Sequence, residues 1–460
     1  MGKRFDFEYI VIGGGVAGIT AAKQLAGAGR KVAIVEQSRL GGADVAYRNV
    51  PQKALSNFSH LYSDAVAGAR FGISSMNLRY NYPTAMHWKT RAIERAAKVN
   101  SKKSLEEAGI TVIKGAAHFV GPYDIAVGSE GKQYSASKFI IATGSTLNTD
   151  GITGVENVPY YTASSILNIP RVPKTALVVG GGASGCEVAQ YLAELGTKVV
   201  LVEMEASILP SEDEEVGRVI EEYLSKRNGI KFFTKTKVIA LERDKISTRA
   251  VFTRGGQERT VRVETVVLAT GSKPAIDIGL KNAKVSFDKH GIVVDRTLQT
   301  SARNVLAAGD VLGGPSSTER ATYTAEVAVT NMIGRSKTFV NYNGFMRIVD
   351  ISPQIASVGK TESELRTKKR KYKRVLVPLS NITASTTADF RIGFLKLLAD
   401  SQGKLLGATM VGPHAADVLQ EISLAIRHEI PLIQIASAPH PANEWSAIVK
   451  IAARKILLSK

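Results

Sequence analysis

The sequence has almost no cysteine and no long apolar run. Its 460 residues contain one cysteine, Cys186, which excludes a disulfide within the chain and is consistent with a reducing compartment. No apolar stretch approaches the roughly 20 residues that span a bilayer. The opening MGKRFDFEYIVIGGG leads from a short polar segment into a strand-like one instead of a signal peptide. We therefore expect a cytoplasmic protein with no transmembrane segment, and we predict no metal site.

Acidic residues are fewer than basic ones. There are 41 Asp and Glu against 60 Lys and Arg, which gives a formal net charge of +19. This charge would concentrate anionic ligands such as dinucleotides, and also nucleic acid or acidic membranes. The densest basic run, KKRKYKR at residues 368–374, is compatible with a nucleic-acid patch, but we interpret it as a solvated loop beside a strand. Nothing in the chain resembles a nucleic-acid recognition module, so no nucleic-acid partner is predicted.

A glycine-rich turn joins a strand to a helix near the start of the chain. The apolar run EYIVI is followed by GGGVAG and then by an alanine-rich helical pattern. At this spacing, Gly13 lets the turn close, Gly15 lets a pyrophosphate approach the backbone, and Gly18 lets the helix pack on the strand. The helix N-terminus adds partial positive charge. A second strand, KVAIVE, ends at Glu36, where a ribose hydroxyl would bind.

The same arrangement recurs in the middle of the chain. ALVV is followed by GGGASG, which contains Gly180, Gly182 and Gly185, then by the helical CEVAQYLAELG and by KVVLVE, which ends at Glu203. Two such units predict two dinucleotides. Glu203 would accept hydrogen bonds from an adenine ribose and repel a 2′-phosphate, so we predict NAD(H) in preference to NADP(H).

The rest of the chain resembles the pyridine nucleotide-disulfide oxidoreductases, the family of dihydrolipoamide dehydrogenase, glutathione reductase and mercuric reductase. The motifs that carry the resemblance are, in order, IIATG, VLATG, TSARNVLAAGDVLGG, ERATYTAEVAVTNMIG, ISPQIASVG and LLGATMVGPHAADVLQEISLAI. The resemblance implies an FAD-binding flavoprotein in which the fourth segment is a helix whose N-terminus lies near the flavin pyrimidine. It also implies cofactor contacts at Gly42, Thr143, Gly144, Gly271, Gly309 and Asp310, the last at the flavin ribitol.

The expected fold class is α/β, with two Rossmann-like dinucleotide-binding domains and a C-terminal α+β dimerisation domain. A chain of this length is too long for a single core. We place FAD binding at residues 1–150 and 280–342, nicotinamide binding at 151–279, and the interface domain of a homodimer at 343–460.

The redox-active cysteines of the family are missing. Members usually carry Leu-Gly-Gly, Thr, Cys, four residues and Cys, whereas this chain reads LGGADVAYRNVPQK at residues 40–53, so Asp44 and Asn49 occupy the two cysteine positions. Neither can form a thiolate or a mixed disulfide, and dithiol exchange is therefore predicted to be absent. Cys186, alone at the start of the second helix, is interpreted as a small buried packing residue.

Two further features of the family's reaction centre are retained in part. Lys53 aligns with the lysine beneath flavin N5 and Glu187 with its glutamate partner, a pair that would stabilise developing negative charge, unless it is an incidental ion pair. His440-Pro441 matches the family's proton-donating histidine. Glu444 stands one residue earlier than the family's glutamate, so its role beside His440 is open, and a histidine kept only for interface packing is an equal alternative.

Asp44 and Asn49 make the pocket opposite the nicotinamide polar. We expect a small hydrogen-bonding acceptor there, such as a quinone, with Tyr47 and Arg48 at its edges, although these residues can also simply fill space. The favoured function is an NADH dehydrogenase of diaphorase or quinone reductase type. The alternatives are nicotinamide nucleotide transhydrogenation, and a flavin-bearing binding protein that resembles dihydrolipoamide dehydrogenase in name only and is recruited to an acidic partner.

Overall fold

A computed structural model describes residues 4–74, 77–149, 151–244 and 246–459, and the chain divides into two compact units. Unit 1 comprises Met1–Leu55, Asn81–Asn148 and Gly271–Asn341, and unit 2 comprises Ser56–Tyr80, Thr149–Thr270 and Tyr342–Lys460. Parts of three sequence predictions lie outside the described residues: the polar lead at residues 1–3, the boundary at 150 and the final position 460.

The main sheet of unit 1 has the strand order β3-β2-β1-β6-β5-β4, and β19 also pairs with β6. The β-branched runs of the sequence form its parallel centre, in which Ile12 is in register with Val35 of β2 and with Ile141 of β6. The three strands therefore end at one edge, and the turns that follow them meet there. The strands are β1 (Phe7–Ile12), β2 (Val32–Glu36), β3 (Ile110–Lys114), β4 (Ala117–Gly121), β5 (Asp124–Val127), β6 (Lys132–Ile141) and β19 (Val305–Ala307).

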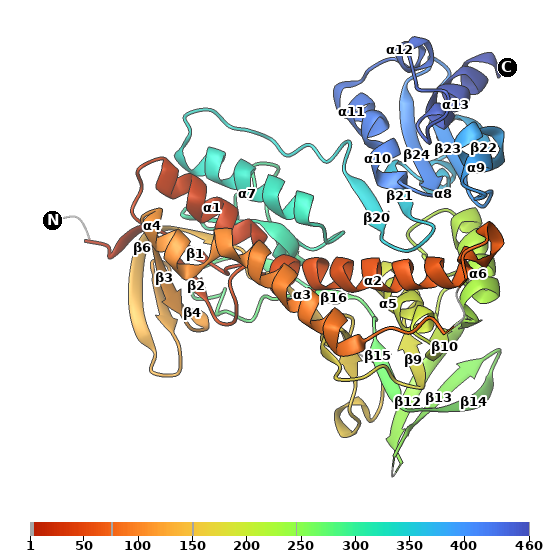
Figure 1. The fold of residues 1–460 in the computed structure, drawn as a ribbon. Coiled ribbons are helices and arrows are strands. Elements are labelled where there is room, and N and C mark those ends of the chain that lie inside the picture. The colour runs from red at the N-terminus through yellow and green to blue at the C-terminus, as the bar shows by residue number, and fades with distance from the viewer. Residues whose placement is uncertain (1–3, 75–76, 150, 245, 460) are drawn as a thin grey trace. The chain divides into compact units, whose positions relative to one another are not determined.

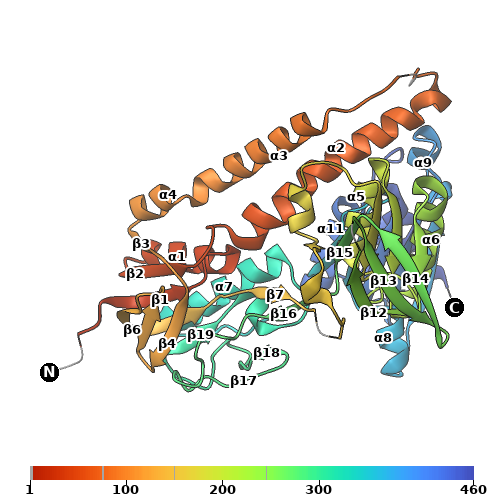
Figure 2. The ribbon, with the colours of Figure 1, turned by 90° about the horizontal axis from the view of Figure 1, so that it is seen from below.

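Helices α1 and α7 lie side by side in unit 1 (Figure 1), and both pack small side chains into one core. The alanine-rich pattern after the first glycine turn forms α1, and Ser317 caps α7 by accepting a hydrogen bond from the Arg320 N–H at 3.1 Å. A short antiparallel pair, β7 with β16, is seen in Figure 2. These elements are α1 (Val16–Gly27), α3 (Tyr82–Ala97), α4 (Lys102–Glu107), α7 (Thr318–Ile333), β7 (Ser145–Leu147), β16 (Ser272–Pro274), β17 (Phe287–Asp288) and β18 (Gly291–Ile292).

Unit 2 contains a second parallel sheet of the same kind, with the order β11-β10-β9-β15-β8. Val179 is in register with Val202 of β10 and with Leu268 of β15, so this sheet also brings its strand ends to one edge. An antiparallel sheet, β12-β13-β14, lies between β11 and β15 in the chain. The elements are β8 (Tyr161–Thr162), β9 (Thr175–Val179), α5 (Ala183–Glu194), β10 (Lys198–Val202), α6 (Glu214–Asn228), β11 (Lys231–Phe233), β12 (Thr236–Arg243), β13 (Thr248–Arg254), β14 (Gln257–Val263) and β15 (Thr265–Leu268).

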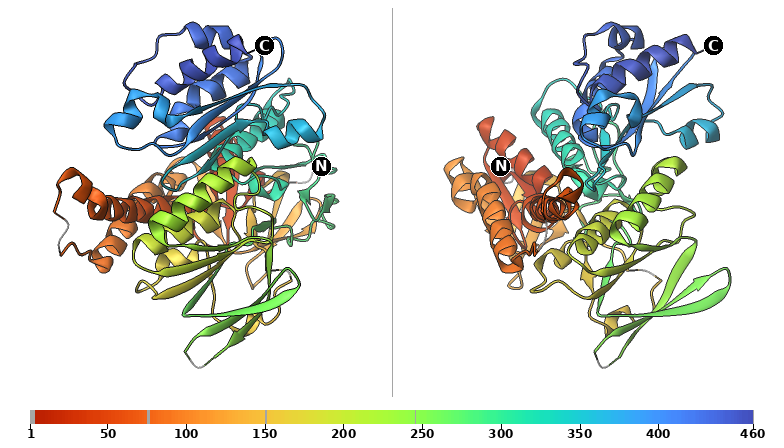
Figure 3. Two further views of the ribbon diagram at one scale, coloured as in Figure 1. Left: turned by 90° about the vertical axis from the view of Figure 1, so that its right-hand side faces the viewer. Right: turned by 45° about the vertical axis from the view of Figure 1, so that its right-hand side comes forward.

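The C-terminal part of unit 2 is an antiparallel sheet, β20-β21-β24-β23-β22, packed against helices (Figure 3, blue). Its core joins β23 and β24, both buried on two faces, to α11, α12 and α13. The elements are β20 (Met346–Val349), β21 (Ile355–Gly359), α8 (Glu362–Thr367), β22 (Lys373–Pro378), α9 (Thr383–Thr387), β23 (Phe394–Ala399), β24 (Leu405–Val411), α10 (Ala415–Val418), α11 (Gln420–His428), α12 (Leu432–Ser437) and α13 (Ala447–Leu458).

The predicted α/β class is confirmed: each glycine-rich unit has the expected order of strand, turn, helix and strand, and the C-terminal part combines an antiparallel sheet with helices. The exact domain boundaries stay predictions. Within the described part of the chain, no helix has both the length and the apolar composition needed to cross a membrane. The same residues include no group of three or more His, Cys, Asp or Glu side chains arranged to hold a metal.

Candidate functional site

In the first glycine-rich turn, two glycines pack too closely against backbone atoms to carry a side chain, and a third faces open space. A Cβ atom on Gly13, whose φ is +108°, would lie 2.2 Å from the Ala142 carbonyl oxygen, and one on Gly18 would lie 1.8 Å from the Gly13 carbonyl oxygen. A Cβ on Gly15 would meet no atom within 4 Å. Gly15 also begins α1 without a side-chain cap, so the first N–H groups of the helix are left for a ligand. This geometry fits a pyrophosphate.

The second turn repeats this geometry in unit 2. A Cβ on Gly180 would lie 2.4 Å from the Ala269 carbonyl oxygen, and one on Gly185 would lie 1.8 Å from that of Gly180. Gly182 again faces open space and begins α5 without a side-chain cap. Two cradles of the same shape therefore stand at the ends of two parallel sheets, as two bound dinucleotides require.

Each predicted ribose-binding acid closes its own glycine turn. Glu36 Oε2 accepts a hydrogen bond of 2.6 Å from the Gly14 N–H, and Glu203 Oε2 accepts one of 2.5 Å from the Gly181 N–H. Glu203 Oε1 also accepts from the Glu205 N–H at 2.8 Å. Each carboxylate is thereby held beside the turn that would carry the adjoining pyrophosphate.

The other predicted cofactor residues border the same strand ends. The hydroxyl of Thr143 donates to the Ala275 carbonyl at 2.7 Å, and the Gly309 N–H donates to Thr324 Oγ1 at 2.9 Å, which ties the Asp310 turn to α7. Gly144, Gly271 and Gly309 have φ values of +73°, +90° and +80°, a backbone conformation that favours glycine. Their predicted contacts with FAD and nicotinamide stay predictions.

The residues at the two family cysteine positions are hydrogen-bonded to each other. Asn49 Nδ2 donates to Asp44 Oδ1 at 2.7 Å and to Thr318 Oγ1 at 2.9 Å. The hydroxyl of Thr318 donates to the same Asp44 oxygen at 2.6 Å. This Asp44-Asn49-Thr318 triad joins the start of α2 (Asn49–Ala67) to the first residue of α7 within unit 1. Our reading of the sequence did not identify Thr318.

The hydroxyl of Tyr47 contacts the loop that follows Glu36, and its predicted place at the edge of the acceptor pocket stays a prediction. Its hydroxyl is hydrogen-bonded to Ser38 Oγ, and the Ser38 N–H donates to Glu36 Oε1. Tyr47 therefore belongs structurally to the loop at the ribose acid of the first unit. Gly42, where a Cβ would lie 2.8 Å from Gly15 Cα, lets this segment cross close to the glycine turn. Arg48 is half-buried.

Lys53 and Glu187 lie in different compact units. Lys53 is exposed on α2, in the part that belongs to unit 1. Glu187 is 8% exposed on α5, and its Oε1 accepts a hydrogen bond of 2.9 Å from the Asp350 N–H within unit 2. Their pairing at the flavin stays a prediction.

Cys186 is a packing residue, as predicted. It is fully buried on α5, and its thiol donates to the Gly181 carbonyl at 3.4 Å. Burial, together with the nearby charges of Glu187 and Glu203, raises the pKa of this thiol far above its usual range. A thiol held neutral in this way is inert toward disulfides.

His440 is held inside its own chain by a carboxylate that the sequence did not suggest. Its Nε2 lies 3.1 Å from Glu421 Oε2, its Nδ1 lies 3.1 Å from the Ala438 carbonyl oxygen, and its side chain is 6% exposed. Glu444, the acid predicted from the sequence, is exposed and belongs to the turn after Pro441. The carboxylate beside His440 is thus Glu421 of α11.

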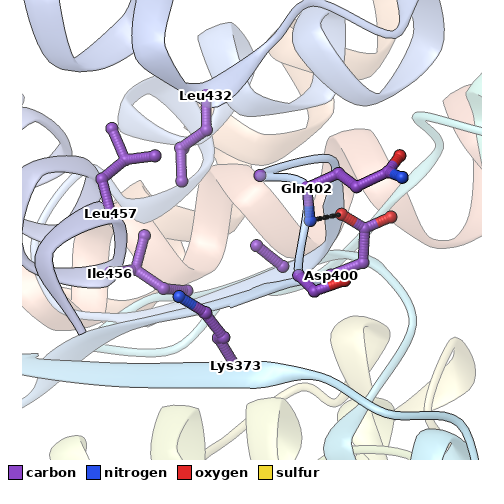
Figure 4. Close-up of a pocket in the computed structure, with 9 residues that line it drawn as sticks. Lys373, Asp400, Gln402, Leu432, Ile456 and Leu457 are labelled. Carbon is purple, nitrogen blue, oxygen red and sulfur yellow. Dashed lines mark hydrogen bonds between the residues drawn. The ribbon is translucent and has the colours of Figure 1, made fainter. Parts of the chain in front are cut away.

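Two features outside the predicted site have structural explanations. The basic run at residues 368–374 begins as an exposed turn, as we interpreted it, but its last two residues, Lys373 and Arg374, are the start of β22, where Arg374 Nε pairs with Glu362 Oε2 at 2.9 Å. A shallow pocket in the C-terminal part of unit 2 is bordered by the turn between β23 and β24, where Asp400 accepts from the Gln402 N–H at 3.0 Å (Figure 4). Lys373 at its rim donates to the Ser459 carbonyl. None of the predicted site residues lines this pocket.

Comparison with known protein families supports the assignment of the two glycine-rich turns as dinucleotide-binding sites. The pyridine nucleotide-disulphide oxidoreductase profile matches residues 7–325, and the dimerisation-domain profile of the same proteins matches residues 345–452. The chain belongs to the pyridine nucleotide-disulphide oxidoreductase family. It is thus a flavin-dependent pyridine nucleotide oxidoreductase, and the cofactors of this family are FAD and NAD(P)H. The dimerisation domain supports a homodimer.

Several characterised relatives extend over nearly the whole chain. A mercuric reductase from Bacillus cereus is 29% identical over 97% of this chain and 71% of its own length. A dihydrolipoyl dehydrogenase from Bacillus subtilis is 28% identical over 95% and 93%, and a dihydrolipoamide dehydrogenase from Chaetomium thermophilum is 30% identical over 95% and 88%. Two solved structures share the fold, each with a TM-score of 0.87. The HOCl-induced flavoprotein disulfide reductase of Escherichia coli is 23% identical and covers 97% of this chain and 99% of its own. LpdA of Mycobacterium tuberculosis is 24% identical and covers 98% of this chain and 100% of its own.

Proposed function

We propose that this family member passes electrons from NADH through FAD to a small non-disulfide acceptor, such as a quinone. The observation that carries the proposal is the replacement of both family cysteine positions by Asp44 and Asn49 in a chain whose single cysteine is buried and inert. Hydride chemistry needs neither cysteine, whereas dithiol exchange needs both.

The roles of the residues follow from the cradles described above. Gly15 and Gly182 would receive the pyrophosphates of FAD and NAD(H), and Glu36 and Glu203 would bind the adenine riboses. Bound FAD would supply a two-electron relay between the nucleotide and the acceptor. Lys53, paired with Glu187, would stabilise negative charge at the relay. The overall reaction balances as NADH + H⁺ + A → NAD⁺ + AH₂, where A is the acceptor.

The setting of Glu203 supports NADH over NADPH. Its side chain is 6% exposed and bound to two backbone N–H groups, so it has little freedom to move away from a 2′-phosphate. A fixed carboxylate near that phosphate costs binding energy through repulsion between like charges. Arginine is absent from the sequence that follows, MEASILP.

We further propose a cytoplasmic homodimer with the domain boundaries given above. The single reduced cysteine supports a reducing compartment, and the matched dimerisation profile supports the interface domain. Sedimentation of the purified holoenzyme would measure the dimer directly.

The deciding experiment mixes purified holoenzyme with NADH anaerobically and follows the flavin absorbance. We expect rapid bleaching of the flavin by NADH. The absorbance should then recover on addition of a quinone, but not on addition of lipoamide or oxidised glutathione. Turnover of a disulfide would overturn the proposal. Recovery only with an NAD⁺ analogue would indicate transhydrogenation, and failure to bleach would indicate a flavin-bearing binding protein.

A further inference from the structure

The hydrogen bonds within the Asp44-Asn49-Thr318 triad leave its side chains with acceptors only. An amide nitrogen carries two N–H donors, a hydroxyl carries one O–H donor, and a carboxylate carries none. Asn49 uses both of its donors on Asp44 and Thr318, and Thr318 uses its donor on Asp44. The charge on Asp44 also sets the orientation of the Asn49 amide, because a flipped amide would place two oxygens against each other.

The triad has spare capacity at its oxygens. Asp44 Oδ1 receives both bonds of the triad, which leaves Oδ2 of the same carboxylate and Oδ1 of Asn49 to accept from a ligand. Asp44, Asn49 and Thr318 are all half-buried, so a molecule that docks against them loses water from its contact face. A carbonyl placed against these side-chain oxygens would gain no hydrogen bond from them, whereas a hydroxyl or N–H would gain one.

We infer that the electron acceptor of this protein carries a hydrogen-bond donor, a hydroxyl or N–H group, which docks on the Asp44-Asn49-Thr318 triad. This inference rests on the proposed function and restricts its substrate class: a plain quinone, whose polar atoms are all acceptors, is a poor match for the triad. Asp44 is the specificity-determining residue, and Thr318 and Asn49 position it.

The test uses two acceptors that differ in one proton: a naphthoquinone with a hydroxymethyl side chain and its methyl ether. Holoenzyme bleached by NADH is mixed with each in a stopped-flow instrument, and the rate of flavin reoxidation is measured against acceptor concentration. A hydrogen bond to a charged group predicts a roughly tenfold or greater preference for the hydroxymethyl compound. Equal rate constants for the two compounds would overturn the inference.

Two variants sharpen the test. In Asp44→Asn the amide oxygen can keep the two triad bonds while the amide nitrogen replaces Oδ2 as a donor, so the preference should fall at least tenfold or reverse toward the ether. Asp64→Asn, an exposed charge change on the same helix, is the matched control and should retain the wild-type ratio. An unchanged ratio in Asp44→Asn would also refute the inference.

Failure of the inference can be told apart from failure of the proposed function. If NADH does not bleach the flavin, or no small acceptor restores its absorbance, the proposed function is wrong. For that case the oxidised holoenzyme is titrated with dihydroxynaphthalene and with naphthoquinone, and the flavin spectrum reports binding without turnover. Tighter binding of the dihydroxy compound, lost in Asp44→Asn, supports the donor-binding triad, and equal binding contradicts it.

Discussion

Glu421 Oε2 lies 3.1 Å from His440 Nε2 and takes the place beside the histidine that the sequence led us to consider for Glu444. Both ring nitrogens of His440 face oxygen atoms of its own chain, so neither is directed at a substrate in this arrangement. The geometry therefore favours the packing alternative for His440, in which the histidine holds the segment between α12 and α13 against α11. The loss of the cysteine pair is consistent with a histidine whose two ring nitrogens both contact oxygen atoms of its own chain.

The first prediction concerns this pair. Glu421→Gln should lower the free energy of unfolding by about 1–3 kcal/mol, because it weakens a charge-assisted hydrogen bond to a buried ring. Glu444→Gln is the control and should stay within about 0.5 kcal/mol of wild type, as exposed substitutions usually do. Urea unfolding of the two variants measures both. A larger effect of Glu444→Gln would mean that the histidine has the other carboxylate as its partner.

The second prediction tests the lysine at the flavin. Lys53→Met should slow the bleaching of the flavin by NADH by roughly tenfold or more, since about 1.4 kcal/mol of lost charge stabilisation corresponds to that factor. Lys103→Met, which removes an exposed lysine from α4, serves as the control. Stopped-flow absorbance measures the rate. If Lys53→Met bleaches as fast as the control, the predicted role of Lys53 is incorrect.

The third prediction concerns nucleotide choice. The wild-type enzyme should show a higher kcat/KM for NADH than for NADPH, and Glu203→Ala should reduce that ratio by roughly tenfold, because the repulsion and the ribose hydrogen bonds disappear together. Glu36→Ala, the equivalent change in the first unit, should weaken FAD binding and leave the ratio unaltered. A wild-type preference for NADPH would refute the assignment of Glu203.

The fourth prediction separates two roles for Tyr47. If Tyr47 serves the FAD end through Ser38, Tyr47→Phe should raise the Kd for FAD several-fold, as loss of a hydrogen bond of about 1 kcal/mol implies. The KM for the acceptor should stay constant. Fluorescence titration of apoprotein with FAD measures the first quantity, and Tyr134→Phe, an aromatic of β6, is the control. A raised KM for the acceptor, with unchanged affinity for FAD, would instead support a role of Tyr47 in the acceptor pocket.

The fifth prediction concerns a buried ion network within unit 2. Lys396 is fully buried on β23 and bonds Asp213 and Glu215, the latter at 2.7 Å, beside Glu362 at 3.6 Å. Lys396→Met should lower the free energy of unfolding by about 3–5 kcal/mol, because it leaves the buried carboxylate of Asp213 without its cation. Lys404→Met, which breaks an exposed pair with Glu429, should cost at most about 1 kcal/mol.

The same ion network makes the free energy of unfolding depend on pH in the acidic range. Burial alone would raise the pKa of Glu215, but the hydrogen bond and charge of Lys396, with a hydrogen bond from Arg374, lower it to about 2 from an ordinary 4.5. A folded-state pKa below the unfolded one means that this stabilisation is present above about pH 4.5 and is lost as the pH falls toward 2. Unfolding curves across this range should show a smaller loss in Lys396→Met than in wild type. Parallel curves would contradict the network's role.

The local patterns of the sequence predicted much of the nucleotide machinery. Strand, glycine turn, helix and acid are consecutive, so short-range rules of sterics and helix N-termini place Gly15 and Glu36, or Gly182 and Glu203, without knowledge of the rest. The helix α7 was also predicted, since the segment ERATYTAEVAVTNMIG has a helical pattern. The sequence did not predict that Thr318, the first residue of this helix, would contact Asp44, which lies 274 positions earlier.

The sequence by itself therefore determined the family, the α/β class, the two dinucleotide cradles and the absence of a usable cysteine pair, because these depend on residue type at short spacing. The tertiary structure decided which side chains satisfy one another: Thr318 with Asp44 and Asn49, Glu421 with His440, and Tyr47 with Ser38. The reason is physical. A half-buried polar group must find a partner, and the partner is whichever group the packing of distant elements brings within about 3 Å, a choice that no local spacing encodes.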